Sequence, residues 1–382
     1  MSPSRVLLAV SADASSDASR GPRRDYAQLA SRLRGDVLDR RAIDASFTGR
    51  AIRAVLGAAP AQAWLAFRRR GRYDAIVTDG EHIGIPLALL LRCSRSAVRH
   101  VTIGHRLTAP KKRPFFRVFR VHRRMDRIAL HARQQYDAAL RDLGIEPGRL
   151  TVIPYQVDTE FWTPQAVLEE PLVVSVGLEY RDYGTLFDAV AGSDVRVVIG
   201  AASHWSRHGF GGHAPPPNVQ VGSFDYESLR ALYARASIVV VPLVDIDNQA
   251  GITTILEAMA MGKPVIVTQS LGQTDVVEDR RRPRDGLRSR PASLTRLIAG
   301  RLGIPVEATG FYVAPGDAVG LRRAIDYLLA HPDVRAQLGS SGRRVAEELF
   351  TVEHFAERMR SLVLASLDAT HDGHLLRRAL YG

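Results

Sequence analysis

Short runs of apolar residues alternate with longer stretches of helical periodicity along most of the chain. In the first half, apolar runs predict buried strands at residues 5–11, 75–78, 98–103 and 150–154. Helices are predicted between them, over 25–34 and 83–91. This alternation is typical of βα units, in which helices connect parallel strands and cover the sheet.

The same alternation starts again after residues 155–164, a stretch rich in turn-forming residues. Strands are predicted there at 172–177 and 195–200, with a helix at 183–190 between them. Two further strand–helix units are predicted at 219–241 and 256–267. Residues 278–304 interrupt this order with an arginine-rich run that also contains prolines, and we predict an inserted loop there.

At 382 residues the chain exceeds what one hydrophobic core usually serves. We therefore predict an α/β fold with two Rossmann-like, doubly wound parallel sheets, in domains 1–160 and 161–382. The terminal helix is expected to pack back toward the first domain. Ligands of such sheets bind beyond the carboxyl ends of the strands, so a cleft between the domains is the expected site.

Positive charge is concentrated in the first half of the chain. Residues 1–160 hold 29 Lys and Arg against 15 Asp and Glu, whereas residues 161–382 hold 23 against 25. An anionic partner of the first half, such as a phospholipid surface, an acidic acceptor or nucleic acid, would explain this distribution. Arginine-rich solvation of an ordinary protein surface would also explain it.

Cys93 is the only cysteine, which excludes a disulfide framework and a zinc site built from thiols. A cytoplasmic setting is expected, with a peripheral place at the inner face of the membrane as an option. The longest apolar runs, such as 83–91 and 238–244, fall short of the roughly 20 residues that a membrane span needs. The short apolar run near the N-terminus does not predict a secretion signal.

Residues 248–266 combine a loop of small residues, a helix start, one carboxylate, a glycine stop and a buried strand. Such a loop exposes backbone N–H groups at the positive end of the helix dipole, which favours phosphate binding. Glu257 lies about two turns into the helix, where its carboxylate can accept hydrogen bonds from the vicinal hydroxyls of a ribose. On spacing alone, a helix cap followed by a surface glutamate is the simpler interpretation.

The whole segment resembles the nucleotide-sugar motif of family-4-like GT-B glycosyltransferases, in which two glutamates lie eight positions apart. Glu257 matches the second glutamate, and the resemblance implies that it binds the ribose of the donor. Gln249 stands in place of the first; its amide can bond a sugar hydroxyl but brings no charge to an oxocarbenium-like transition state. The loop residues that the resemblance places against the donor are Ala250, Gly251, Ile252, Thr253 and Thr254.

Residues 174–183 are similar to the loop that follows the first strand of the family's donor domain. Gly177 lies in this loop, and Arg181 matches the position of a lysine that meets the diphosphate. Leu178 occupies the place of an arginine, and Arg207 is a candidate to compensate for it.

Residues 219–229 are similar to the stretch that receives the base of the nucleotide, with Ser223 and Phe224 as the candidate contacts. Weaker matches extend the resemblance over most of the chain, at residues 143–161, 309–317 and 350–364.

His105 follows a predicted strand at a position where the resembled family often has a histidine that faces the donor sugar. An imidazole there can bond a sugar hydroxyl or relay a proton from the acceptor. Asp79, Glu81 and His82 also follow a predicted strand and are candidates for acceptor contact. For all four residues, a structural role at a strand end or helix cap is the alternative.

Residues 106–127 interleave basic and aromatic side chains. This pattern suits an anionic membrane surface into which Phe115, Phe116 and Phe119 insert, but it also suits single-stranded nucleic acid or ordinary packing under a basic face. Asp245 and Asp247 are interpreted as turn residues, because the resembled enzymes use no metal.

The resemblance implies transfer of a sugar from a UDP- or GDP-type nucleotide-sugar to a lipid, glycan or small-molecule acceptor. Retention of the anomeric configuration is implied, with no metal and no other cofactor. The loop N–H groups and Arg181 would stabilise the departing diphosphate. A non-catalytic nucleotide-sugar-binding protein is the first alternative, and a nucleic-acid-binding protein is the second; the leading interpretation expects no nucleic acid.

Overall fold

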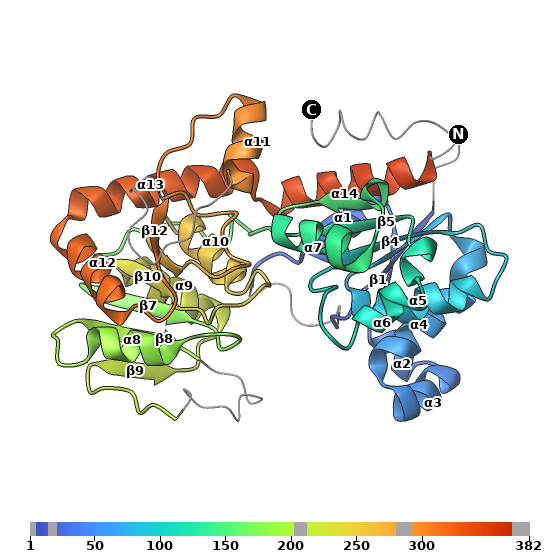
Figure 1. Cartoon of the computed structure of the whole chain (residues 1–382), viewed down its shortest axis with the longest axis horizontal. Helices are drawn as coiled ribbons and strands as arrows, with labels where there is room; N and C mark the ends of the chain where they lie inside the picture. The colour runs from blue at the N-terminus through green and yellow to red at the C-terminus, as the bar shows by residue number, and fades with distance from the viewer. Residues whose placement is uncertain (1–4, 14–20, 202–211, 280–291, 369–382) are drawn as a thin grey trace. The chain divides into compact units, whose positions relative to one another are not determined.

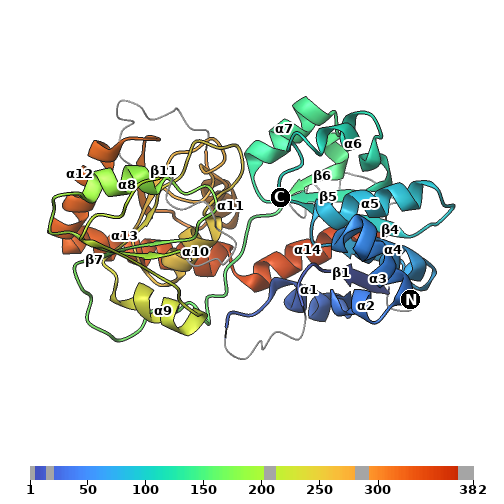
Figure 2. The same cartoon turned by 90° about the horizontal axis from the view of Figure 1, so that it is seen from below.

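The computed structural model describes residues 5–13, 21–201, 212–279 and 292–368 of the chain. These residues form two compact units (Figures 1 and 2). The first unit holds Arg23–Pro154, the strand that precedes them and the described residues from Glu353 onward, and the second unit holds Tyr155–Val352. The boundary therefore falls after Pro154, six residues before the position that the sequence pattern suggested.

The first unit is built on a parallel sheet of six strands in the order β2-β1-β3-β4-β5-β6. The strands are β1 (Val6–Ala9), β2 (Asp36–Leu38), β3 (Ala75–Thr78), β4 (Arg99–Gly104), β5 (Arg127–Leu130) and β6 (Leu150–Val152). Successive residues of β1 point to opposite faces, so that Val6 and Leu8 enter one core cluster and Leu7 and Ala9 enter another.

Helices cover both faces of this sheet (Figure 1). They are α1 (Asp25–Leu33), α2 (Arg41–Asp44), α3 (Phe47–Leu56), α4 (Ala58–Arg69), α5 (Glu81–Arg92), α6 (Arg113–Arg117), α7 (Arg133–Leu143) and α14 (Val352–Leu367), with short 3-10 turns η2 (Arg70–Arg72), η3 (Val121–Arg124) and η4 (Pro147–Arg149). The last helix, α14, buries Phe355, Met359 and Leu362 against the face that carries Val6 and Leu8. Helix α14 is thus part of the first unit's core.

The second unit is also built on a parallel sheet of six strands, in the order β12-β11-β10-β7-β8-β9. The strands are β7 (Leu172–Val176), β8 (Arg196–Gly200), β9 (Val219–Gly222), β10 (Ile238–Val241), β11 (Val265–Thr268) and β12 (Gly310–Val313). All residues of β10 and β11 are buried, as expected for central strands covered on both faces.

The helices of the second unit are α8 (Tyr183–Val190), α9 (Tyr226–Arg235), α10 (Ile252–Ala260), α11 (Leu294–Leu302), α12 (Ala318–Ala330) and α13 (Pro332–Leu349). Helices α8 and α12 cover one face of the sheet, and α9, α10 and most of α13 cover the other (Figure 2).

One expectation for the second unit is wrong in part. Residues 278–304 were expected to form an inserted loop, but Leu294–Leu302 form helix α11. The side chain of Ser293 accepts a hydrogen bond from the backbone N–H of Arg296 at 3.1 Å and so caps the helix. The proline- and arginine-rich run at 280–291 lies outside the described residues.

Candidate functional site

The strand order of the second unit reverses between β7 and β10, which are hydrogen-bonded neighbours. The two loops that leave their carboxyl ends lie against each other. The backbone N–H of Val244 donates to the carbonyl oxygen of Tyr180 at 3.1 Å, and that of Asp182 donates to Pro242 at 3.1 Å. Open α/β sheets bind their ligands at such a switch point, because the loops diverge there and leave a crevice.

The helix α10 starts at this switch point without a side-chain cap. Its N-cap residue, Gly251, has φ of 77°, in the left-handed region, and a Cβ there would lie 2.6 Å from Cγ1 of Val241. Glycine is therefore required both by conformation and by space. The N–H groups of Ile252, Thr253 and Thr254 in the first turn point out of the helix start, where the helix dipole favours an anion.

Arg181 lies beside the start of α10. Its guanidinium donates to the carbonyl oxygens of Val176, at 2.8 and 3.0 Å, and of Glu179 at 3.0 Å, and to Oγ1 of Thr254 at 3.2 Å. Burial lowers the pKa of Arg181. Most of its N–H donors are thus committed to the protein, and the side chain supplies a fixed positive charge next to the α10 start.

Gly177 makes room for this guanidinium. Its φ is 97°, and a Cβ there would lie 2.6 Å from Nη2 of Arg181. A side chain at position 177 would therefore displace the guanidinium of Arg181, the residue that the sequence assigned to the diphosphate.

Glu257 lies within α10 and is only 7% exposed. Its Oε2 accepts a hydrogen bond of 3.0 Å from the hydroxyl of Tyr233 in α9. Burial raises the pKa of Glu257 to about 8, against smaller opposite effects from the Tyr233 hydrogen bond and the charge of Arg181. The carboxyl is therefore largely protonated at neutral pH, rather than an open surface carboxylate.

Gln249 precedes the helix and has an amide whose oxygen and nitrogen are both buried. Among the described residues, neither atom has a hydrogen-bond partner. The loop around it is held in place by Gln273, which donates to the carbonyl oxygen of the buried residue Ala250 at 2.9 Å. A buried amide without partners costs about 1–3 kcal/mol, so Gln249 marks a place suited to a polar ligand.

Ser223 and Phe224 follow β9, at the same carboxyl-end edge of the sheet. Ser223 is exposed, while Phe224 is half-buried and packs near Gly200 and Gly222. An aromatic ring and backbone groups at this edge suit a planar base.

The first unit has its own switch point, between β1 and β3. Ser11 donates to Oδ2 of Asp79 from its backbone N–H, at 2.5 Å, and from its hydroxyl, at 2.7 Å. The Nε2–H of His105, which follows the neighbouring strand β4, donates to the carbonyl oxygen of Asp79 at 3.0 Å. His105 is exposed, so its ring can also meet a ligand.

Glu81 does not belong to the open surface of this group, although the sequence made it a candidate for acceptor contact. It is buried and accepts hydrogen bonds from the backbone N–H groups of His105, at 2.9 Å, and Arg106, at 3.1 Å, and it pairs with Lys112. Burial by itself would raise the pKa of Glu81, but Lys112 and His105 outweigh it and lower the pKa to about 2. Glu81 therefore holds the loop that carries His105.

Three residues near these sites were not singled out from the sequence. Tyr233 bonds Glu257 from another helix, 24 positions earlier in the chain. His131 follows β5, and its ring centroid lies 5.5 Å from that of His105. Burial lowers the pKa of His131 to about 3. Asp25 begins α1, and its pKa is raised by burial and by the charge of Asp79. No local motif marks any of them; only their positions after strands or on packed helices could have suggested them.

The aromatic side chains of residues 106–127 are not all exposed, as insertion into a membrane surface would require. Phe116 is fully buried in the core beneath α5 and α7, and Phe115 is half-buried, whereas Phe119 is 48% exposed. Insertion of all three rings into a membrane is therefore wrong, since α6 turns Phe116 inward. Asp245 accepts a hydrogen bond from the backbone N–H of Leu271 at 3.0 Å, which joins two segments that are 26 positions apart in the chain.

Arg207 lies outside the described residues. In the part of the chain that the structure describes, no group of three or more His, Cys, Asp and Glu side chains is placed to hold a metal ion. No helix in that part is long and apolar enough to cross a membrane.

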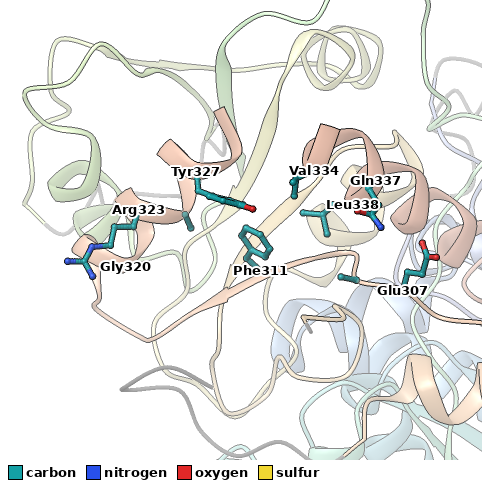
Figure 3. A pocket seen from close by; sticks show the side chains of 10 residues that line it. Glu307, Phe311, Gly320, Arg323, Tyr327, Val334, Gln337 and Leu338 are labelled. Atoms are coloured by element: carbon teal, nitrogen blue, oxygen red, sulfur yellow. The ribbon is translucent and has the colours of Figure 1, made fainter. Parts of the chain in front are cut away.

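A separate hollow of about 640 Å³ lies between β12, α12 and α13 (Figure 3). Phe311, Val334 and Leu338 form an apolar floor, and Glu307 and Arg323 lie at its rim. None of the site residues described above lines it, so its size does not bear on the site at the α10 start.

Two six-stranded parallel sheets, each with a strand-order reversal and helices on both faces, define the GT-B fold. Solved structures agree over nearly the whole chain. They include a glycosyltransferase from Rickettsia africae (TM-score 0.64, 13% identity, 97% of this chain and 100% of that one). Sucrose-phosphate synthase from Thermosynechococcus elongatus gives a TM-score of 0.67 at 19% identity, over 96% and 100% of the two chains. HepE of Anabaena, in complex with UDP and glucose, gives 0.65 at 15% identity, over 95% and 99%.

At these identities the structural likeness shows the fold. Residues 194–331, within the second unit, match the family model described as glycosyl transferases group 1. No curated protein matches the sequence significantly. The chain thus has the GT-B fold, and its second unit carries a segment similar to glycosyl transferases of group 1.

Proposed function

We propose that the protein transfers a sugar from a nucleoside-diphosphate sugar to an acceptor, with the donor bound at the start of α10. The observation that carries this proposal is the buried amide of Gln249, which has no partner among the described residues and lies next to the uncapped helix start at Gly251. A hydroxyl-bearing sugar would satisfy the amide, and an attached diphosphate would meet the N–H groups of α10.

The remaining donor contacts follow from the same edge of the sheet. In this proposal the positive charge of Arg181 attracts the diphosphate, and the carboxyl of Glu257 forms hydrogen bonds with the ribose hydroxyls. Ser223 and Phe224 contact the base. A UDP-type donor is favoured, because structures of HepE from Anabaena contain UDP or UDP-glucose. In a largely protonated state, Glu257 can donate one hydrogen bond to a hydroxyl and accept another.

The chemistry that we propose is a retaining transfer without a covalent enzyme intermediate. The bond between the anomeric carbon and the diphosphate oxygen breaks, the acceptor oxygen forms the new bond on the same face, and the proton of the acceptor hydroxyl passes to the departing diphosphate oxygen. The negative charge on the departing diphosphate is stabilised by the α10 N–H groups and by Arg181. We further propose that this stabilisation takes the place of a metal ion and that no cofactor is needed.

The acceptor is proposed to contact the first unit around His105, whose exposed ring is fixed by Asp79 and by the loop that Glu81 holds. A lipid, a glycan or a small molecule could offer the hydroxyl. The basic side chains of residues 106–127 support an anionic membrane surface as a partner, and the free, exposed Cys93 is compatible with a cytoplasmic setting at that surface.

A thermal-shift screen of nucleoside diphosphates and nucleotide-sugars, combined with an assay for diphosphate release, tests the proposal. We expect the melting temperature to rise with one class of nucleotide. Glu257→Ala should remove this rise, and the matched control Glu227→Ala, an exposed residue of α9, should keep it. A screen without any shift would contradict the proposal.

The turnover assay separates catalysis from binding. Gln249→Ala should keep the nucleotide shift and lower turnover by roughly 100-fold, as loss of one transition-state contact does. The control Gln337→Ala, on α13, should leave both unchanged. Turnover in excess EDTA should equal that without it.

Two observations favour a second candidate, a nucleotide-sugar-binding protein without transferase activity. Most donors of Arg181 are already bonded to the protein, and the amide of Gln249 carries no charge. A clear nucleotide shift without turnover on any acceptor would select this candidate.

A further inference from the structure

Helix α3 presents an apolar face to solvent at the outer edge of the first unit, beside α2 and α4 (Figure 1). Phe47 is 79% exposed and Val55 is 81% exposed. Ala51 and Ala54 are exposed as well. With 100° between successive residues, these four side chains share one side of the helix, an arc roughly 100° wide.

The opposite side of α3 explains why these residues point outward. Gly49 is buried, and a Cβ there would lie 2.8 Å from the carbonyl oxygen of Ile43 in α2. Ile52 packs against the core cluster beneath α2 and α4. The helix is therefore anchored through Gly49 and Ile52, and Ser46 caps its start by accepting from the N–H of Gly49 at 3.1 Å. Its outward face is fixed by packing.

An amphipathic helix on a globular unit normally turns its apolar side to the core. In α3 the exposed side is the apolar one, and leaving large apolar side chains in water costs free energy that a covering partner would recover. The arrangement therefore indicates an interaction surface.

The charges around α3 indicate the chemistry of the partner. Arg50 borders the apolar arc and Arg53 lies roughly 60° further around the helix. Residues 45–73 contain six arginines and no acidic residue. Arg53 pairs with Asp44 at 2.5 Å, and Arg50 donates to the carbonyl oxygen of Asp44 at 2.6 Å, but both arginines stay exposed. Basic residues beside an apolar stripe match an anionic lipid surface, where the stripe enters the acyl boundary and the cations meet the headgroups.

We propose that α3 is an interfacial helix that lies in the surface of an anionic membrane, with Phe47 and Val55 inserted and Arg50 and Arg53 at the headgroups. A second copy of the chain fits this face less well, because an isologous contact would bring the same arginines close to each other. Nucleic acid fits less well too, since Phe47 is the only one of the four side chains that can stack on a base.

This proposal goes beyond the donor site and does not depend on it. The basic side chains of residues 106–127 would add electrostatic attraction, but insertion is assigned to α3. The distinction is testable, because attraction alone disappears at high salt, whereas insertion of apolar side chains persists.

Co-sedimentation of the full chain with vesicles tests the proposal. Vesicles of phosphatidylcholine with about 30 mol % phosphatidylglycerol represent the anionic surface, and phosphatidylcholine alone is the reference. We expect the double variant Phe47→Ser, Val55→Ser to bind the anionic vesicles roughly tenfold more weakly than the natural chain. The matched control Leu168→Ser, Val319→Ser removes two exposed apolar side chains of the second unit, 91% and 60% exposed, and should bind normally.

A second measurement reports insertion directly. The Phe47→Trp variant should show a blue-shifted tryptophan emission with anionic vesicles, and Val319→Trp should not. Four outcomes would overturn the proposal: no binding to anionic vesicles, equal binding by the two double variants, an unshifted emission of Phe47→Trp, or a dimer that the Phe47→Ser, Val55→Ser variant alone dissolves. Salt-sensitive binding to an RNA oligomer that the α3 variant abolishes, without vesicle binding, would also overturn it.

Discussion

The hydroxyl of Tyr233 donates a hydrogen bond of 3.0 Å to Oε2 of Glu257 in the interior of the second unit. Burial and the nearby carboxyl raise the pKa of Tyr233, so its hydroxyl keeps its proton and remains the donor. The pair joins α9 to α10 at the point where the carboxyl of Glu257 would meet a nucleotide. Two consequences can be tested.

The first concerns the donor hydroxyl. Tyr233→Phe leaves the ring in the core but removes the hydrogen bond that holds the Glu257 carboxyl, so we expect nucleotide affinity to fall by roughly five- to tenfold, about 1–1.4 kcal/mol. Isothermal titration with the nucleotide found in the thermal-shift screen measures this change. The control Tyr327→Phe, an exposed tyrosine of α12, should leave affinity unchanged. Equal affinity in both variants would remove Tyr233 from the proposed site.

The second concerns pH. The pKa of Glu257 is raised from 4.5 to about 8 in the folded protein. Between these values the folded state holds a proton that the unfolded state has released, so this residue makes the free energy of unfolding fall as pH rises from about 4.5 to about 8. Glu257→Gln should remove this contribution and flatten the pH profile in that window. Urea unfolding at several pH values tests this, with Glu227→Gln as the exposed control; identical slopes for natural chain and Glu257→Gln would contradict the raised pKa.

The conformation at the start of α10 gives a third prediction. Gly251→Ala introduces a Cβ at positive φ and within 2.6 Å of Val241, so we expect a loss of about 2–4 kcal/mol in unfolding free energy together with weaker nucleotide binding. Gly192→Ala is the matched control, since its φ is 66° but nothing lies within 4 Å of the added Cβ. It should cost only about 1 kcal/mol and leave binding unchanged. Similar losses in both variants would show that crowding at Gly251 is relieved by movement.

The buried ion pair of Glu81 and Lys112 gives a fourth prediction. Glu81→Ala leaves the Lys112 ammonium and the N–H groups of His105 and Arg106 without their acceptor, so we expect a loss of about 3–5 kcal/mol. Because the pKa of Glu81 is lowered to about 2, its contribution to stability is complete above about 4.5 and is lost as pH falls toward 2. Unfolding of Glu81→Ala and of the control His82→Ala, measured at pH 7 and pH 3, separates the two effects. A gap between the variants that is as large at pH 3 as at pH 7, or larger, would argue against a depressed pKa.

Much of the fold follows from local sequence patterns. Strands at 75–78 and 172–177 and the helix at 183–190 were predicted within a residue of Ala75–Thr78, Leu172–Val176 and Tyr183–Val190, because apolar runs and helical periodicity are properties of neighbouring residues. The strand Arg127–Leu130 was not predicted, since its four residues include one arginine and show no clear alternation of apolar and polar side chains. The start of α10 was also predicted from the local sequence, because Gly251 and the residues that follow it lie next to each other in the chain.

The environment of each site residue was decided by the tertiary structure. Burial raises the pKa of Glu257 to about 8, and Tyr233 and Arg181, which lie 24 and 76 positions earlier, oppose part of this rise. Glu81 holds a loop rather than facing an acceptor because Lys112 folds onto it. The sequence by itself determined which residues could carry charge, accept a bend or fill a core, since those are properties of single side chains and their neighbours. Which of them are buried, paired or open to a ligand was decided only by packing, because burial and pairing depend on segments that are distant in the chain.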